Sequence, residues 1–84
     1  MNDLRGTLRR ALASRFGIKR ALDDDTELFS SGLIDSLSVI DLVCLVETET
    51  GQSIPPAEIT LENFDSVNRI AQFVEALASV GTGK

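Results

Sequence analysis

The residue that offers the clearest chemistry in this sequence is Ser36, which stands between Asp35 and Leu37. Gly32 closes the preceding loop, Asp35 occupies the position of a helix N-cap, and an apolar run long enough for several helical turns follows. Ser36 is therefore predicted to lie in the first turn of a helix. A phosphate esterified to its hydroxyl would lie near unpaired backbone N–H groups and the positive end of the helix dipole, which favours a phosphate there.

The same serine lacks the neighbouring base that a catalytic nucleophile needs. The chain contains no histidine, and no residue near Ser36 in the sequence could act as its general base. Cys44 is the single cysteine, so it cannot form an internal disulfide, and without a histidine partner it is interpreted as a small apolar residue. We therefore expect no catalytic residue and a protein that is not an enzyme.

The helix predicted over about residues 36 to 50 has two different faces. At about 100° per residue, one side is purely apolar and wide enough to face a core; it holds Val39, Leu42, Val43 and Val46. The other side carries Ser36 with a mixture of apolar, polar and acidic residues. Such a mixture suits transient docking of other proteins, and the alternative is that a loop crossing the helix start buries Leu37 and Ile40. The candidate recognition residues are Asp35, Leu37, Ile40, Asp41, Cys44 and Glu47.

Two further patterned segments accompany the stretch from Gly32 to Leu37. Thr26-Glu27-Leu28-Phe29 precedes it, and Asn63-Phe64-Asp65-Ser66-Val67 with Ile70-Ala71-Gln72-Phe73-Val74 follows it. Together these segments resemble the acyl carrier and peptidyl carrier protein family over nearly the whole chain. The resemblance implies that Ser36 bears a covalent 4'-phosphopantetheine arm derived from coenzyme A. The chain departs from many fatty-acid carriers at Ser38 and Thr48, where those proteins often have acidic residues.

The resemblance also implies a function and a set of partners. It implies a free-standing carrier that holds an acyl or aminoacyl group as a thioester on the arm and presents it to enzymes of a biosynthetic pathway. The implied partners are a phosphopantetheinyl transferase, an acyl- or aminoacyl-loading ligase and a downstream transferase. From Ser38 and Thr48 we expect a short, polar cargo. The alternative function is an unmodified helical interaction or adaptor domain that binds a basic partner through the acidic face of the second helix.

Length and composition indicate one soluble globular domain, residues 1–84, acting as a monomer. The 84 residues suffice for one modest core, and 43% of them are hydrophobic. No apolar stretch approaches the ~20 residues that a membrane span requires. The first residues, Met-Asn-Asp-Leu-Arg, lack the apolar core of a secretory signal, so we expect a cytoplasmic protein.

The charges of this acidic chain are unevenly distributed. Residues 1–20 hold six of the eight basic residues and one of the thirteen acidic residues. The acidic remainder, which contains Ser36, predicts partners with basic surfaces and argues against nucleic acid. The run Asp23-Asp24-Asp25 lacks the ligand spacing of a calcium loop, so no metal site is expected.

The elements follow from apolar periodicity and from the residues that begin and end helices. A helix is predicted over about residues 3–16, with its arginines forming a solvated face, and a long loop over 18–35. The second helix, about 36–50, is followed by a short turn at 56–61, a helix at about 65–78 and a flexible tail at 79–84. The expected fold is all-α, a small antiparallel bundle of three main helices plus one short helix, with a long loop after the first.

Overall fold

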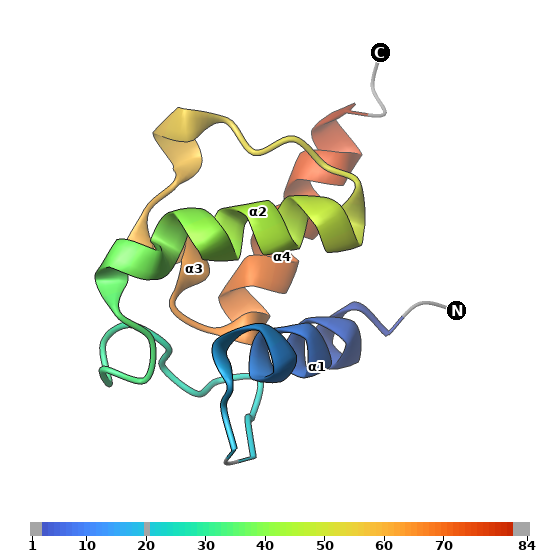
Figure 1. The fold of residues 1–84 in the computed structure, drawn as a ribbon. Helices are drawn as coiled ribbons and strands as arrows, with labels where there is room; N and C mark the ends of the chain where they lie inside the picture. Colours follow the sequence, from blue (N-terminus) through green and yellow to red (C-terminus); the bar gives the residue numbers. More distant parts are fainter. Residues whose placement is uncertain (1–2, 20, 82–84) are drawn as a thin grey trace.

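The computed structural model describes residues 3–19 and 21–81, with the side chains of 78–81 left aside. Its four α-helices are α1 (Leu4–Phe16), α2 (Val39–Thr50), α3 (Leu61–Phe64) and α4 (Val67–Gly81), as Figure 1 shows. Two 3-10 turns, Ser36–Ser38 and Pro56–Glu58, lie between them, and the described ranges contain no strand. The prediction of a small all-α bundle with a long connection after its first helix is confirmed.

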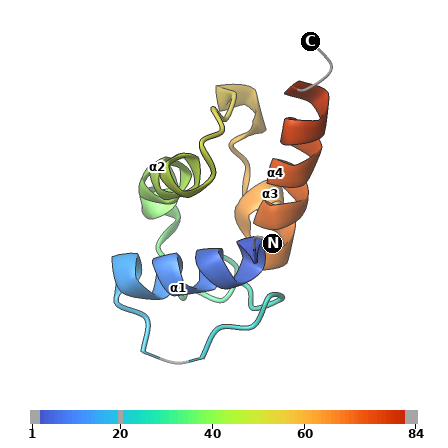
Figure 2. The same cartoon turned by 90° about the vertical axis from the view of Figure 1, so that its right-hand side faces the viewer.

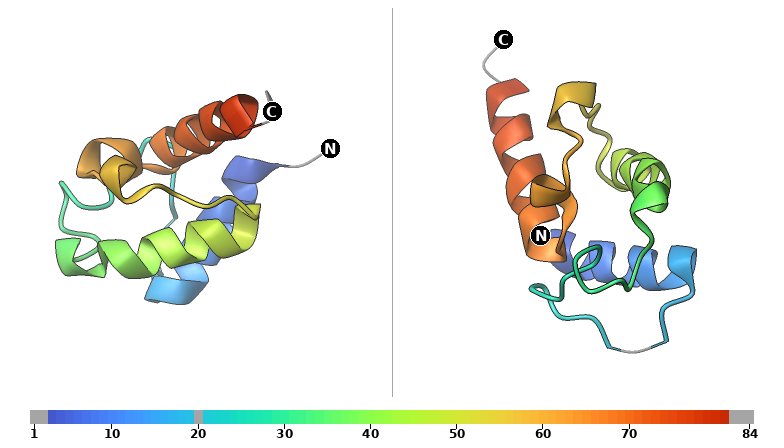
Figure 3. Two further views of the ribbon diagram at one scale, coloured as in Figure 1. Left: turned by 90° about the horizontal axis from the view of Figure 1, so that it is seen from above. Right: turned by 90° about the vertical axis from the view of Figure 1, so that its left-hand side faces the viewer.

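Helix α1 lies across one end of the molecule, and the other two long helices, α2 and α4, pack against it. In Figure 2, α4 stands upright, α2 is seen end-on, and α1 runs crosswise below both. The two views of Figure 3 agree with this arrangement, and α1 packs against both α2 and α4. The chain after α2 passes over the side away from α1 and then brings α3 against α4.

The core lies between these helices and includes part of the long connection. Its buried apolar side chains are Leu8, Leu12, Leu28, Phe29, Ile34, Leu42, Val43, Val46, Ile54, Phe64, Val67, Ile70, Ala71 and Val74. Phe64 packs edge-on against Phe73, with ring centroids 5.7 Å apart. The apolar stripe predicted for α2 therefore faces the core, since Leu42, Val43 and Val46 are buried.

Local sequence signals explain where two of the helices begin or end. The Asp3 carboxylate accepts a hydrogen bond from the Gly6 N–H at 3.0 Å and caps α1. Gly51 ends α2 in the left-handed region, with φ of 72°, and its N–H donates to the Glu47 carbonyl. A residue with a Cβ would be strained at this φ.

Several predicted boundaries differ from the observed ones. The helix expected at 65–78 is α4, which begins at Val67 because the Ser66 hydroxyl caps it by accepting from the Arg69 N–H at 3.1 Å. It continues to Gly81 because no proline interrupts its backbone hydrogen bonds. Residues 79–81 of the predicted flexible tail are thus helical, and 82–84 lie outside the described residues.

The segment expected as one short turn at 56–61 is divided into two pieces. A 3-10 turn covers Pro56–Glu58, and α3 begins separately at Leu61. Thr60 caps α3, since its hydroxyl accepts from the Asn63 N–H at 3.3 Å. The sequence pattern did not resolve this second, short helix from the turn.

The arginines of α1 form more than a solvated face. Arg5 pairs with Glu75 of α4 at 3.4 Å, Arg15 pairs with Asp41 of α2 at 3.2 Å, and Arg9 pairs with Asp24 of the long connection. Each of these three arginines contacts a different segment. The expected face thus keeps contact with solvent and also makes ion pairs, because α1 lies across the other elements and brings these side chains within reach of their acids.

Candidate functional site

Ser36 opens a 3-10 turn that leads directly into α2. Asp35 precedes it in extended backbone conformation, and its carboxylate accepts a hydrogen bond from the Leu37 N–H at 3.1 Å. The Asp35 carbonyl accepts from the Ser38 N–H at 2.8 Å. Asp35 therefore caps the helical segment as the sequence predicts, although the first turn of the predicted helix is 3-10 and α2 itself begins at Val39.

The Ser36 side chain is exposed, while the chain just before it is anchored in the core. Ile34 is only 3% exposed, and its N–H donates to the Leu28 carbonyl at 2.8 Å. The hydrogen bonds among the described side chains do not involve the Ser36 hydroxyl, and the Leu37 N–H beside it donates to the Asp35 carboxylate. A group esterified to this oxygen would extend into solvent without displacing an internal contact, so Ser36 fits a covalent arm.

The apolar residues beside Ser36 are open to solvent. Leu37 is 87% exposed and Ile40 is 59% exposed. The alternative that a crossing loop buries these two residues was therefore wrong. Cys44 is also exposed, so its thiol takes no part in the core. We define the outer face of α2 as the exposed surface of this helix and of the turn before it, formed by Asp35, Leu37, Ile40, Asp41 and Cys44.

The two acids of α2 that were selected as recognition residues are in different situations. Asp41 is exposed and its carboxylate pairs with Arg15. Glu47 is half-buried, and its carboxylate accepts a hydrogen bond from the Ile54 N–H at 2.8 Å. Glu47 therefore fastens the chain that follows α2, whereas Asp41 stays on the surface. Arg15 was missed from the sequence because it lies 26 residues from Asp41.

A second polar cluster lies at the start of α4 and fastens the long connection. The Asp65 carboxylate accepts from the N–H groups of Phe29 and Ser30, at 2.8 and 3.0 Å, and from the Ser30 hydroxyl at 2.6 Å. Burial raises the pKa of Asp65, but these hydrogen bonds and the charge of Arg69 outweigh burial and hold that pKa below its ordinary value of 3.8. Asp65 is therefore a structural carboxylate.

The acidic run in the long connection contacts the helices around it. Asp24 pairs with Arg9, and the Asp25 carboxylate accepts from the Asn68 amide at 3.3 Å. Over the described ranges no three potential ligands among Asp, Glu, Cys and His are grouped to hold a metal ion.

The family of the chain follows from its overall sequence pattern. The pattern of the family described as "Phosphopantetheine attachment site" matches residues 6–74, which is most of the chain. The chain belongs to this phosphopantetheine carrier family. Its cofactor is covalently attached 4'-phosphopantetheine, and members of the family carry groups without catalysing reactions themselves. Carriers of this family work with a phosphopantetheinyl transferase and with loading and transfer enzymes.

Individual relatives of this carrier come from several bacteria. The D-alanyl carrier protein of Lactococcus lactis subsp. cremoris (strain MG1363) is 36% identical over 53 residues, which are 63% of this chain and 67% of the relative. That of Enterococcus faecalis is 34% identical over 55 residues, 66% of this chain and 70% of the relative. The lincomycin biosynthesis protein LmbN of Streptomyces lincolnensis is 45% identical over 58 residues, 69% of this chain. The match spans only about a fifth of LmbN, 21% of its length.

Within the part of the chain that the structure describes, no helix is both long enough and apolar enough to cross a membrane.

Proposed function

We propose that this chain holds an acyl or aminoacyl group as a thioester on a 4'-phosphopantetheine arm attached to Ser36. It presents that group to partner enzymes of a biosynthetic pathway and is not itself an enzyme. The observation that carries the assignment is that the Ser36 side chain is exposed, immediately after the capping residue Asp35 at the entry to α2. When attached, the arm supplies the terminal thiol that forms the thioester.

Attachment requires little from the chain apart from an accessible hydroxyl. The Ser36 oxygen forms a bond to the phosphorus of the phosphopantetheine half of coenzyme A, and the bond to the adenosine bisphosphate half breaks. The hydroxyl proton must pass to a base of the transferase, because the chain has no histidine and Asp35 is engaged by the Leu37 N–H. The buried Ile34 and the cap at Asp35 keep the oxygen at the surface for this reaction.

The outer face of α2 is the proposed docking surface for partner enzymes. Leu37 and Ile40 offer exposed apolar contacts, and Cys44 lies on the same face. Asp35 and Asp41 supply negative charge for basic partner surfaces. Glu47 contributes less to docking than the sequence suggests, because its carboxylate is held by the Ile54 N–H.

The cargo proposed for this carrier is a short aminoacyl or polar acyl group. The D-alanyl carrier proteins among its relatives support an amino acid, as their name states. The proposed partners are a phosphopantetheinyl transferase, a loading ligase and a downstream transferase, and the proposed working form is a cytoplasmic monomer.

Intact mass measurement tests the attachment site. The chain is incubated with coenzyme A and a broad-specificity phosphopantetheinyl transferase, alongside the variants Ser36→Ala and Ser66→Ala. The wild-type chain and Ser66→Ala should gain the mass of one arm, and Ser36→Ala should gain none. An arm on Ser36→Ala would refute the site, and an unmodified wild-type chain would favour the adaptor function instead.

A further inference from the structure

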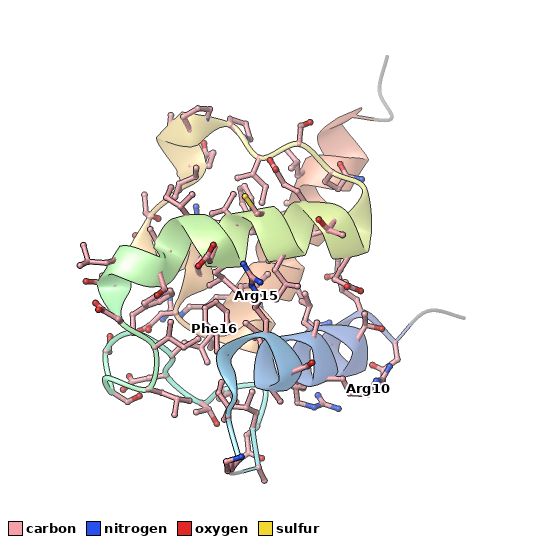
Figure 4. The ribbon with its side chains drawn as sticks, in the orientation of Figure 1. Arg10, Arg15 and Phe16 are labelled. Atoms are coloured by element: carbon pink, nitrogen blue, oxygen red, sulfur yellow. The ribbon has the colours of Figure 1, made fainter. Side chains whose placement is uncertain are left out.

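The outer face of α2 includes a side chain that belongs to another helix. Arg15 extends from the last turn of α1 toward α2, whereas Arg10 points away from α2 (Figure 4). The Arg15 Nη2 lies 3.2 Å from the Asp41 Oδ1. These two residues, with Cys44, Leu45 and Thr48, line a surface hollow of about 220 Å³.

Among the three acids selected for docking, Asp41 is the one whose carboxylate pairs with a side chain, and that side chain can move away to free it for a partner. The Asp35 carboxylate is engaged by the Leu37 N–H, and the Glu47 carboxylate by the Ile54 N–H, so backbone groups fix both. Asp41 is engaged by a guanidinium. The Arg15 and Asp41 side chains are 54% and 57% exposed, so solvent and a docking protein can reach the pair.

An exposed ion pair of this kind is weak enough to be exchanged. Such a pair shifts an equilibrium by about fivefold at most, because water and salt screen it and two flexible side chains must be ordered. A lysine or arginine of a partner can therefore displace Arg15 from Asp41. Until it does, Arg15 occupies the position that the partner's cation would take.

We propose that Arg15 is a specificity-determining residue of the docking surface, because it competes with basic partner side chains for Asp41. This inference rests on the proposed function of the outer face of α2. Arg15 weakens the attraction between that face and a basic protein surface that places no cation at Asp41. A partner contacts Asp41 only if it brings a lysine or arginine close enough to replace the Arg15 guanidinium. The choice of partner therefore depends on where its cation lies as well as on its charge.

A double-mutant cycle on the whole chain tests this competition. The kcat/KM of modification by a broad-specificity phosphopantetheinyl transferase is measured at low salt for the wild-type chain, Arg15→Gln, Asp41→Asn and the double variant. Arg10→Gln is the matched control, since it removes the same charge from an exposed arginine of the same helix that points away from α2. Arg15→Lys keeps the charge and should stay near wild type.

Competition predicts a rise in rate and a coupling between the two positions. Arg15→Gln should raise kcat/KM about threefold, and Arg10→Gln by less than about 1.5-fold, the size expected of one exposed charge acting at a distance. Asp41→Asn should lower kcat/KM only slightly in the wild-type background. In the Arg15→Gln background the same substitution should lower kcat/KM by a factor about threefold larger. A purely structural Arg15 would instead give a slower reaction and a less stable fold for Arg15→Gln.

Three results would overturn the inference. They are equal effects of Arg15→Gln and Arg10→Gln, additive effects of the Arg15 and Asp41 substitutions, and a lower rate for Arg15→Gln. These results leave the proposed function intact as long as the wild-type chain gains its arm at Ser36. Failure of the wild-type chain to gain any arm would refute the proposed function and this inference with it.

Discussion

The chain contains the same pair of residues, aspartate followed by serine, at the entry to two helices. Asp35 and Ser36 precede α2, and Asp65 and Ser66 precede α4. Ser36 is exposed, whereas Ser66 is only 5% exposed and its hydroxyl accepts from the Arg69 N–H. The first pair leaves its serine available for attachment, and the second uses its serine as a helix cap.

The two aspartates differ in the same way. Among the described residues, the hydrogen bonds that Asp35 accepts come from its own turn: its carboxylate accepts from the Leu37 N–H and its carbonyl from the Ser38 N–H. Asp65 bonds across 35 and more residues to Phe29 and Ser30, and its carbonyl also accepts from the Leu28 N–H at 2.6 Å. The same dipeptide sequence thus forms a surface site at residues 35–36 and, at 65–66, a structural junction where the long connection is bonded to the start of α4. The packing around each copy decides its role.

The largest loss of stability in either pair should appear when the aspartates are removed. Asp65→Ala should lower the free energy of unfolding by about 2–3 kcal/mol, because two backbone N–H groups and a hydroxyl lose their charged acceptor. Asp35→Ala should cost about 1 kcal/mol, the usual loss of an N-cap. Urea unfolding of both variants measures the difference, and equal costs would contradict a structural junction at Asp65.

The pH dependence of stability gives an independent test of Asp65. Its folded pKa lies below its unfolded value, so its contribution is fully present above about the ordinary value of 3.8 and is lost as the pH falls through the folded pKa. The stability gap between the wild-type chain and Asp65→Asn should therefore be constant near neutral pH and narrow below pH 3.8. Urea unfolding across this range measures the gap. If it stayed constant down to about pH 2, the pKa of Asp65 would be the same in the folded and unfolded chains, and the hydrogen bonds would not favour the charged carboxylate.

The next largest loss of stability concerns the apolar residue after each serine. Val67→Ala should lower the free energy of unfolding by about 2 kcal/mol, because two buried methyl groups are lost and a cavity remains. Leu37→Ala should change it by less than about 0.5 kcal/mol, since this side chain is almost fully exposed. Leu37→Ala should instead slow modification by the transferase. Thermal unfolding and kcat/KM measured on the same two samples separate the effects.

The smallest contrast concerns the serines themselves. Ser66→Ala should cost about 1 kcal/mol through loss of the α4 cap. Ser36→Ala should change the free energy of unfolding by less than about 0.5 kcal/mol, because its hydroxyl is exposed and takes no part in the hydrogen bonds among the described side chains. A large loss of stability for Ser36→Ala would mean that this hydroxyl has a structural role, and the comparison of the two pairs would fail.

Much of the fold could be predicted because its signals are local. The inner stripe of α2, the cap at Asp35 and the helix end at Gly51 each depend on residues within a few positions of one another. The boundaries of α3 and α4 could not be predicted as well, since Thr60 and Ser66 compete with neighbouring residues that can also cap. The candidate attachment residue came from the same local pattern, and its modification stays a prediction.

The sequence by itself thus determined an all-α carrier fold, the position of Ser36 at a helix entry and the absence of a histidine that could activate it. Only the tertiary structure decided that Leu37 and Ile40 stay exposed, that Ile54 engages Glu47 and that Arg15 reaches Asp41. The physical reason is distance along the chain. Helix periodicity and capping are set by neighbours three or four residues apart, whereas burial and ion pairs between helices depend on how distant segments pack.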